Sequence, residues 1–206
     1  LDHVPGGKGA NQAVAAARLG AAVRFVGAVG EDDFGRYATS ELLAAGADLS
    51  GIQVAGAPTG IALILVDESG ENQIVVVPGA NHALDPTAVQ VGQPDAVICQ
   101  LELRDEPIEA ALRQTDAFFC LNAAPARPVP GAILERADLI VANSLELEAL
   151  GSSPMGTLFA LTLGAEGALL LDDGVEVARA APPLVEGVDG TAAGDVALKL
   201  FTAAAA

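Results

Sequence analysis

The feature that most constrains the fold is a series of short apolar runs in the second half of the chain. These runs are AVICQLEL (96–103), AFFCLNAA (117–124), LIVANS (139–144) and LFALTLG (158–164). A helical pattern, DEPIEAALRQ (105–114), separates the first run from the second, and SLELEALG (144–151) separates the third from the fourth. Strands that are apolar throughout and alternate with helices predict a parallel sheet covered on both faces.

In such a sheet, ligands bind beyond the carboxyl ends of the strands. Polar or glycine residues fall at this point, after the apolar core of each run (VICQL, FFCL, LIVA and FAL): Glu102, Asn122, Asn143, Thr162 and Gly164. Earlier in the chain, AAVRFVGAVG (21–30) is typical of a strand, and DDFGRYATSELLAAG (32–46) is typical of a helix with an acidic start and a glycine stop. We therefore expect one α/β domain over residues 1–206, with its site along the carboxyl edge of the sheet.

Residues 52–78 break the alternation of strands and helices. IQVAG (52–56) and GIALILVDESGENQIVVVP (60–78) indicate consecutive strands, with DESGEN (67–72) as a hairpin turn. The strands are apolar on both faces, so we expect a β lid in which one face covers substrate and the other contacts a partner subunit. An ordinary edge hairpin is the alternative.

Composition excludes several classes of function. Ten Lys and Arg residues against 27 Asp and Glu residues give a net charge of −17, which would repel nucleic acid. Cys99 and Cys120 lie inside apolar runs, which favours two buried, reduced thiols over a disulfide or a metal site. The sequence shows neither a signal peptide nor an apolar run of membrane-spanning length, so we expect a soluble, cytoplasmic protein with no membrane partner.

A glycine-rich turn precedes the first predicted helix, in PGGKGANQAVAAARLG (5–20). A P-loop needs Ser or Thr after its lysine and four residues between its glycines, whereas Gly9 follows Lys8 here, so we exclude that motif. Gly6 and Gly7 allow the backbone to approach a ligand closely. Lys8 and Asn11 offer side-chain donors at a spacing that suits adjacent hydroxyls of a small polar molecule.

A second permissive stretch is VDGTAAGD (188–195), in which small residues stand directly before a carboxylate. Small side chains leave backbone N–H groups open to an anion, and the carboxylate at their rim can act as a base. A plain helix cap is the alternative.

Taken together, the motifs resemble those of ribokinases, within the PfkB family of carbohydrate kinases. The motifs occur in this order from residue 5 to the end: PGGKGANQAVAAARLG, TGIALILVDESGENQIVVVPGAN, QLE, LNAAPAR, NSLELEALG, TLGAEGALL and VDGTAAGD. The resemblance implies a ribokinase-like three-layer α/β/α sandwich with a central, mainly parallel sheet and a small β-sheet lid. It also implies ATP-dependent phosphorylation of the primary hydroxyl of D-ribose, giving ribose 5-phosphate and ADP. The lid, apolar on both faces, separately suggests a homodimer joined through it.

The same resemblance assigns roles to individual residues. It makes Asp195 the catalytic base, with an anion hole for the γ-phosphate at Ala192, Ala193 and Gly194. The positions that match sugar-binding residues are Gly7, Lys8, Gly9, Ala10, Asn11, Glu102 and Asp195. Those that match nucleotide-binding residues are Asn143, Thr162, Leu163, Gly164, Ala165, Glu166, Gly167, Gly194 and Thr202. Glu146 matches a residue that holds Mg²⁺ through water, and Asp189 with the Thr191 carbonyl matches part of a K⁺ site.

The resemblance also implies segments that the sequence does not contain. Ribokinases carry a sugar-binding Asp on a strand before the position of LDHVP, and a last strand after the position of TAAAA. Only 13 residues separate LIVANS from LFALTLG, near the minimum for a parallel crossover, and seven separate Asp195 from Ala203. We therefore expect that interior segments are missing from this sequence.

Two other functions stay open from the sequence. One is a PfkB-family kinase for another sugar or a nucleoside, and the other is a non-catalytic protein that binds a sugar or nucleotide. A dinucleotide-binding oxidoreductase is excluded because no G-x-G-x-x-G turn stands between a strand and a helix.

Overall fold

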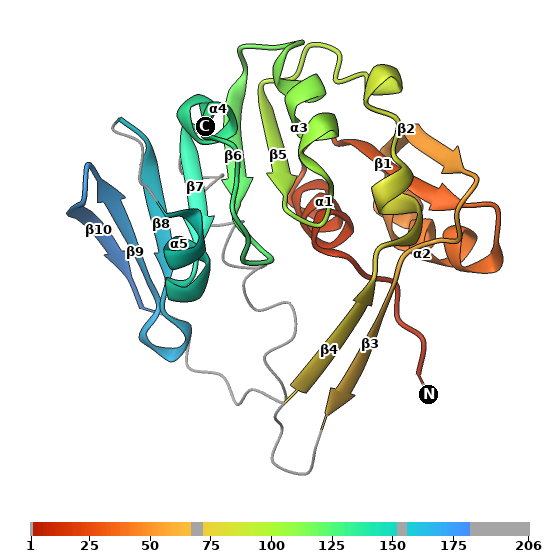
Figure 1. Cartoon of the computed structure of the whole chain (residues 1–206), viewed down its shortest axis with the longest axis horizontal. Coiled ribbons are helices and arrows are strands. Elements are labelled where there is room, and N and C mark those ends of the chain that lie inside the picture. The colour runs from red at the N-terminus through yellow and green to blue at the C-terminus, as the bar shows by residue number, and fades with distance from the viewer. Residues whose placement is uncertain (1, 67–71, 152–155, 182–206) are drawn as a thin grey trace.

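A six-stranded sheet lies at the centre of the computed structural model, which describes residues 2–66, 72–151 and 156–181 (Figure 1). Its strands, in spatial order, are β10 (Val175–Ala180), β9 (Ala168–Asp172), β8 (Leu158–Thr162), β7 (Leu139–Ala142), β6 (Phe118–Asn122) and β5 (Ala96–Gln100). Strands β5 to β8 are parallel, while β9 and β10 continue the sheet as an antiparallel hairpin. The sheet confirms the predicted fold class.

Three short helices connect the parallel strands: α3 (Asp105–Leu112), α4 (Gly131–Arg136) and α5 (Ser144–Leu150). The sequence patterns predict α3 and α5 but not α4, because six residues are too few for a helical period to show. Phe119, Leu121 and Ile140 are fully buried in the layer that contains these helices. Strand residues of the opposite parity, such as Cys120 and Val141, are buried on the other face. Burial on both faces explains why these runs are apolar throughout.

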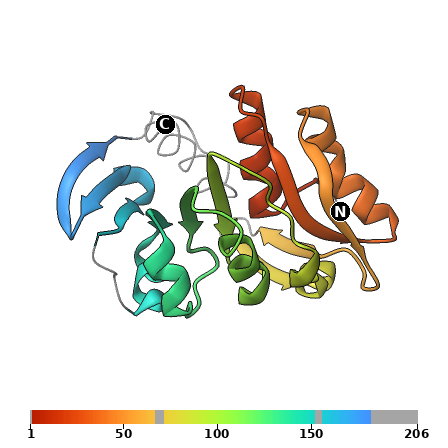
Figure 2. The ribbon, with the colours of Figure 1, turned by 90° about the horizontal axis from the view of Figure 1, so that it is seen from above.

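A second parallel pair precedes this sheet. Strand β1 (Arg24–Gly30) pairs with β2 (Asp48–Ala55) through the crossover helix α2 (Asp33–Ala44), and α1 (Lys8–Arg18) packs beside α2. Val14 of α1 and Leu42 of α2 share a small core with Ala47. Figure 2 shows α1 and α2 on one side of the strands and α3 and α5 on the other, which gives three layers.

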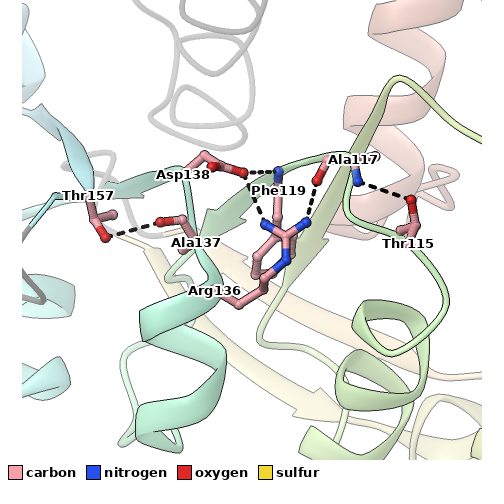
Figure 3. Close-up of polar contacts among 7 residues, drawn as sticks. All are labelled: Thr115, Ala117, Phe119, Arg136, Ala137, Asp138 and Thr157. Atoms are coloured by element: carbon pink, nitrogen blue, oxygen red, sulfur yellow. Dashed lines mark hydrogen bonds and ion pairs between the residues drawn. The ribbon is translucent and has the colours of Figure 1, made fainter.

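Polar contacts hold the amino-terminal edge of the main sheet (Figure 3). Asp138 Oδ2 accepts hydrogen bonds from Phe119 N at 2.7 Å and from Arg136 Nη1 at 3.2 Å, while Arg136 Nη2 donates to Ala117 O at 2.6 Å. Thr157 Oγ1 donates to the carbonyl of Ala137 at 3.0 Å. These contacts join β6, β7 and β8 where the strands begin, at the edge opposite to the predicted site.

The predicted lid is a two-stranded antiparallel sheet of β3 (Ile61–Val66) and β4 (Asn72–Val77). It is shorter than the expected 52–78. Residues 52–55 belong to β2, whose backbone groups pair with β1 instead, so only β3 and β4 form the hairpin. The predicted turn residues 67–71 lie outside the described residues.

The root of the hairpin is tightly packed. Asp32 caps α2 by accepting from Gly35 N at 2.8 Å, and it also accepts from Thr59 N at 2.9 Å and Thr59 Oγ1 at 2.6 Å. The hydrogen bond from the Thr59 side chain is the main reason that the pKa of Asp32 lies below its usual value. In the short helix η1 (Gly79–Ala83), which follows β4, Ala80 N donates to Pro58 O at 2.8 Å. The segment that enters the hairpin (58–59) is therefore hydrogen-bonded both to the segment that leaves it (79–80) and to the N-cap of α2.

Within the described residues, the structure contains no helix both long and apolar enough to cross a membrane.

Gly79 gives a test of this tight root. Its φ is +50°, and a Cβ placed there would lie 2.2 Å from Pro58 O. Gly46 also has a positive φ, +81°, but a Cβ there meets nothing within 4 Å. Gly46→Ala is expected to lose about 1–2 kcal/mol of stability from the left-handed conformation alone. Gly79→Ala should lose at least about 1 kcal/mol more, which corresponds to a further drop of about 2–4 °C in melting temperature. Equal melting temperatures for the two variants would show that the backbone near Pro58 can move away from the new Cβ at little cost, and would contradict the tight packing.

Candidate functional site

The predicted sugar-binding residues meet at the amino end of α1. Gly7 is the N-cap of this helix, with a φ of +99°, and Lys8 N donates to Glu102 Oε2 at 2.9 Å. Glu102 comes two residues after the end of β5, so the helix start and the strand end come together over 94 positions in the sequence. The carboxylate binds the positive end of the helix dipole, which stabilises both groups. Gly7, Lys8, Gly9, Ala10, Asn11 and Glu102 thus form one cluster.

A pair of glutamines fixes the distance between α1 and β5. Gln100 Nε2 donates to Gln12 Oε1, and Gln12 is buried. A Cβ on Gly9 would lie 2.8 Å from Gln100 Oε1, so a larger residue there would displace the Gln100 amide from its present position. Neither glutamine belongs to the predicted site. The sequence feature that could have indicated this contact is Gln12 itself, an amide side chain among the alanines of α1.

The carboxyl ends of the parallel strands form one continuous edge. In register, Gln100 lies opposite Asn122, Asn122 opposite Val141, and Ala142 opposite Leu161. The predicted polar positions after β5, β7 and β8 therefore follow one another along this edge. Asn122 is only 5% exposed, and its Oδ1 accepts from Ala124 N at 3.3 Å, so it shapes the turn after β6.

Asn143 and Glu146 form a capping box at the start of α5. Glu146 N donates to Asn143 Oδ1 at 2.9 Å, and Asn143 N donates to Glu146 Oε2 at 2.8 Å. This reciprocal pair is a structural reason for both residue types. The box uses one oxygen of a half-buried carboxylate. The donor set fits a Mg²⁺ ion held through water, because Mg²⁺ keeps several waters and takes few protein ligands.

The predicted nucleotide loop joins β8 to β9 through the short helix η3 (Gly164–Glu166). Leu163 N donates to Gly167 O at 2.8 Å and closes the loop. Thr162 Oγ1 donates to Ala142 O at 3.4 Å, which ties the loop to the residue before Asn143. Thr162, Leu163, Gly164, Ala165, Glu166 and Gly167 therefore stand next to the end of β7.

Several predicted residues lie outside the described residues: Asp189, Thr191, Ala192, Ala193, Gly194, Asp195 and Thr202. Their roles as catalytic base, anion hole, K⁺ site and adenine contact stay predictions.

The two cysteines are chemically quiet. Both are free, as predicted, and burial raises the pKa of each thiol to about 12. A thiol with so high a pKa stays neutral at physiological pH, and only the thiolate is a good nucleophile or metal ligand.

Comparison with known proteins gives consistent results. The sequence matches the pfkB family of carbohydrate kinases over residues 1–206. It is 37% identical to a ribokinase of Bacillus subtilis (strain 168) over 222 residues, covering 98% of this chain and 74% of that protein. The fold is similar to that of Thermotoga maritima ribokinase, with a TM-score of 0.83, 29% identity, and coverage of 98% of this chain and 74% of the other. It is also similar to Arabidopsis thaliana ribokinase complexed with ribose and ATP, with a TM-score of 0.80, 26% identity, and coverage of 97% and 74%.

Proposed function

Because the chain belongs to the pfkB family of carbohydrate kinases, we propose that it transfers the γ-phosphoryl group of ATP to the primary hydroxyl of D-ribose. The products are ribose 5-phosphate and ADP. The observation that carries the proposal is the contact between Lys8 N and Glu102 Oε2, which brings the sugar-binding positions of the family motif together. The similarity to proteins named ribokinase supports ribose over other sugars.

The cluster at α1 has the chemistry that a sugar needs. Lys8 and Asn11 are three residues apart on the helix and therefore lie on the same side of it. The carboxylate of Glu102 is an acceptor whose orientation is set by its bond to Lys8 N. Directed donors and acceptors of this kind distinguish one pattern of hydroxyls from another.

For the second substrate, we place Mg-ATP along the carboxyl edge of β7 and β8, at Asn143 and the loop 162–167. We propose Asp195 as the base that takes the proton from the sugar hydroxyl, with Ala192, Ala193 and Gly194 as donors to the phosphoryl group. Phosphoryl transfer depends mostly on positioning and on stabilising charge, which backbone donors and Mg²⁺ supply. K⁺ at Asp189 and the Thr191 carbonyl completes the proposed set of cofactors. ATP and reduced thiols are both typical of the cytoplasm, where we place the reaction.

A panel of possible acceptors tests this function. ADP release would be measured with ribose, deoxyribose, fructose and adenosine, in the presence and absence of Mg²⁺ and K⁺. We expect the highest kcat/KM with ribose, a requirement for Mg²⁺, and a higher rate with K⁺. Asp195→Asn should keep sugar binding by calorimetry but lose at least about 100-fold in kcat, as is usual when a general base is removed.

The panel separates the alternatives. A preference for another acceptor would identify a different kinase of the family. Binding of sugar and nucleotide without turnover would identify a non-catalytic binding protein, and near-normal turnover in Asp195→Asn would exclude this residue as the base.

The role of Glu146 can be separated from its role in the capping box. In Glu146→Gln the amide oxygen can still accept from Asn143 N, so the melting temperature should stay unchanged, while the negative charge is lost. We expect the Mg²⁺ concentration for half-maximal rate to rise about tenfold, as for other ligands that act through a metal's outer shell. Glu148→Gln, an exposed charge on the same helix, is the matched control. An equal Mg²⁺ requirement in both variants would reduce Glu146 to a helix cap.

We also propose that the hairpin β3–β4 acts as a lid and as the contact between two subunits. Side chains alternate between its faces, yet both faces are apolar and exposed, with Leu63 at 47% and Ile64 at 43%. One face can cover the sugar and exclude water, which leaves the other for a second copy of the chain. Exposed apolar surface on both sides of a thin sheet is typical of an interface.

Light scattering tests the interface. We expect a dimer for the wild type and a monomer for Leu65→Asp, because a charge on the lid cannot be buried against a second subunit at low cost. Leu65 is 63% exposed in β3, and Leu43 is 68% exposed on α2. Leu43→Asp therefore adds the same charge at a similarly exposed leucine and should stay dimeric. A monomeric wild type at micromolar concentration would refute the lid contact.

A further inference from the structure

Arg127 makes an unusual set of contacts with the segment that carries Glu102. Its Nε donates to Leu101 O at 3.3 Å and its Nη2 donates to Leu103 O at 3.1 Å. These two carbonyls stand directly before and after Glu102 in the chain. The guanidinium therefore binds the backbone on both sides of Glu102, the acidic residue that contacts the start of α1.

The same guanidinium is itself held in place. Its Nη1 donates to Pro128 O at 3.1 Å and lies 2.7 Å from Asp105 Oδ1 at the start of α3. Within the described residues, Asp105 Oδ1 is buried and has no hydrogen bond of good geometry, so its charge is balanced by this ion pair. All three guanidinium nitrogens thus have a defined partner, and both charged side chains are about one third exposed or less.

A backbone bond completes the arrangement. Leu101 N donates to Ala124 O at 2.9 Å, just before the turn that leads to Arg127. The segment after β6 therefore holds residues 101–103 through one amide and two carbonyls. The motif LNAAPAR, which carries Arg127, contains none of the residues to which the family resemblance assigns a ligand-binding or catalytic role.

We propose that Arg127 is a positioning residue for sugar recognition: by binding the carbonyls of Leu101 and Leu103, it fixes the Glu102 carboxylate on Lys8 N and toward the sugar hydroxyls. This inference rests on the proposed function for its effect on sugar binding. Its structural part, the link from Arg127 through Glu102 to Lys8, does not depend on which ligand binds.

The planar shape of the guanidinium matters to this role. Two donors in a fixed fork can meet two carbonyls two residues apart, whereas the ammonium of lysine is a point charge on a flexible chain. Arg127→Lys keeps the charge beside Asp105 but loses the fork. It therefore separates the positioning role from simple charge balance.

The first experiment measures kinetics. For Arg127→Lys and Arg127→Met we expect the KM for ribose to rise about tenfold, with kcat changed less than threefold and the KM for ATP unchanged. Arg113→Met is the matched control, because the ion pair of Arg113 with Glu109 on α3 is exposed and involves neither Glu102 nor Lys8. In a Glu102→Ala background no carboxylate is left to position, so Arg127→Met should add nothing further to the sugar dissociation constant measured by calorimetry, because residues acting in one unit are not additive.

The second experiment does not need turnover. Amide hydrogen exchange is followed at residues 7–9 and 101–104 in the wild type, Arg127→Lys and Arg113→Met. We expect faster exchange at both segments in Arg127→Lys only, although Lys8 is 119 positions away from residue 127. Melting temperatures identify any general loss of stability, which would speed exchange throughout the chain.

The outcomes distinguish the two proposals. If the wild type phosphorylates no sugar but exchange at Lys8 rises in Arg127→Lys, the proposed function fails and the positioning link stands. If exchange at Lys8 is unchanged, or if Arg127→Met raises the KM for ATP as much as that for ribose, the inference about Arg127 is overturned.

Discussion

The hydrogen bond from Lys8 N to Glu102 Oε2 connects the two parallel units of this fold. One unit is the β1–β2 pair with its helices, and the other is the six-stranded sheet. A carboxylate at the amino end of a helix is stabilised by the helix dipole and in turn satisfies an amide that has no partner within the helix. The buried contact between Gln12 and Gln100 reinforces this join one turn further along α1. The proposed sugar-binding residues at the start of α1 therefore lie where two structural units meet, which is a common place for ligand sites.

Parts of this arrangement follow from sequence patterns, and parts cannot. The apolar runs of β5 to β8 predict a buried parallel sheet, because a strand buried on both faces needs an apolar residue at nearly every position. The last residues of these runs then mark the carboxyl edge of the sheet. The sequence pattern does not predict that β2 pairs with β1 rather than with β3. IQVAG has the same composition as a hairpin strand, and only the crossover through α2 decides its partner. The contacts of Arg127 are equally invisible, because they join a side chain to backbone carbonyls, which every sequence contains.

Arginine–carbonyl and arginine–carboxylate contacts occur at both edges of the main sheet, but they have different roles there. At the amino edge, Arg136 bridges a carbonyl and Asp138. Thr157, just before β8, donates to the Ala137 carbonyl before β7, so polar groups are paired with one another. At the carboxyl edge, Arg127 binds the backbone beside Glu102 and Asp105 balances its charge. The acidic side chain between those carbonyls then faces the start of α1. Because Arg127 is paired with Asp105 and with the backbone carbonyls, it can hold the segment that carries the Glu102 carboxylate in place. A preorganised site requires such support from neighbouring residues.

Electrostatics also separates the two substrates. A chain with a net charge of −17 offers little attraction to ATP, so an anion needs local donors. The amino end of α1 is not available for that purpose, because Glu102 already neutralises it. A phosphate brought there would meet a carboxylate, whereas the uncharged hydroxyls of a sugar can share the same donors and acceptors. The glycine-rich start of α1 therefore favours a neutral ligand, although glycine-rich helix starts often bind phosphate. The phosphoryl group then needs a different set of backbone donors, and VDGTAAGD is the stretch whose composition suits that role.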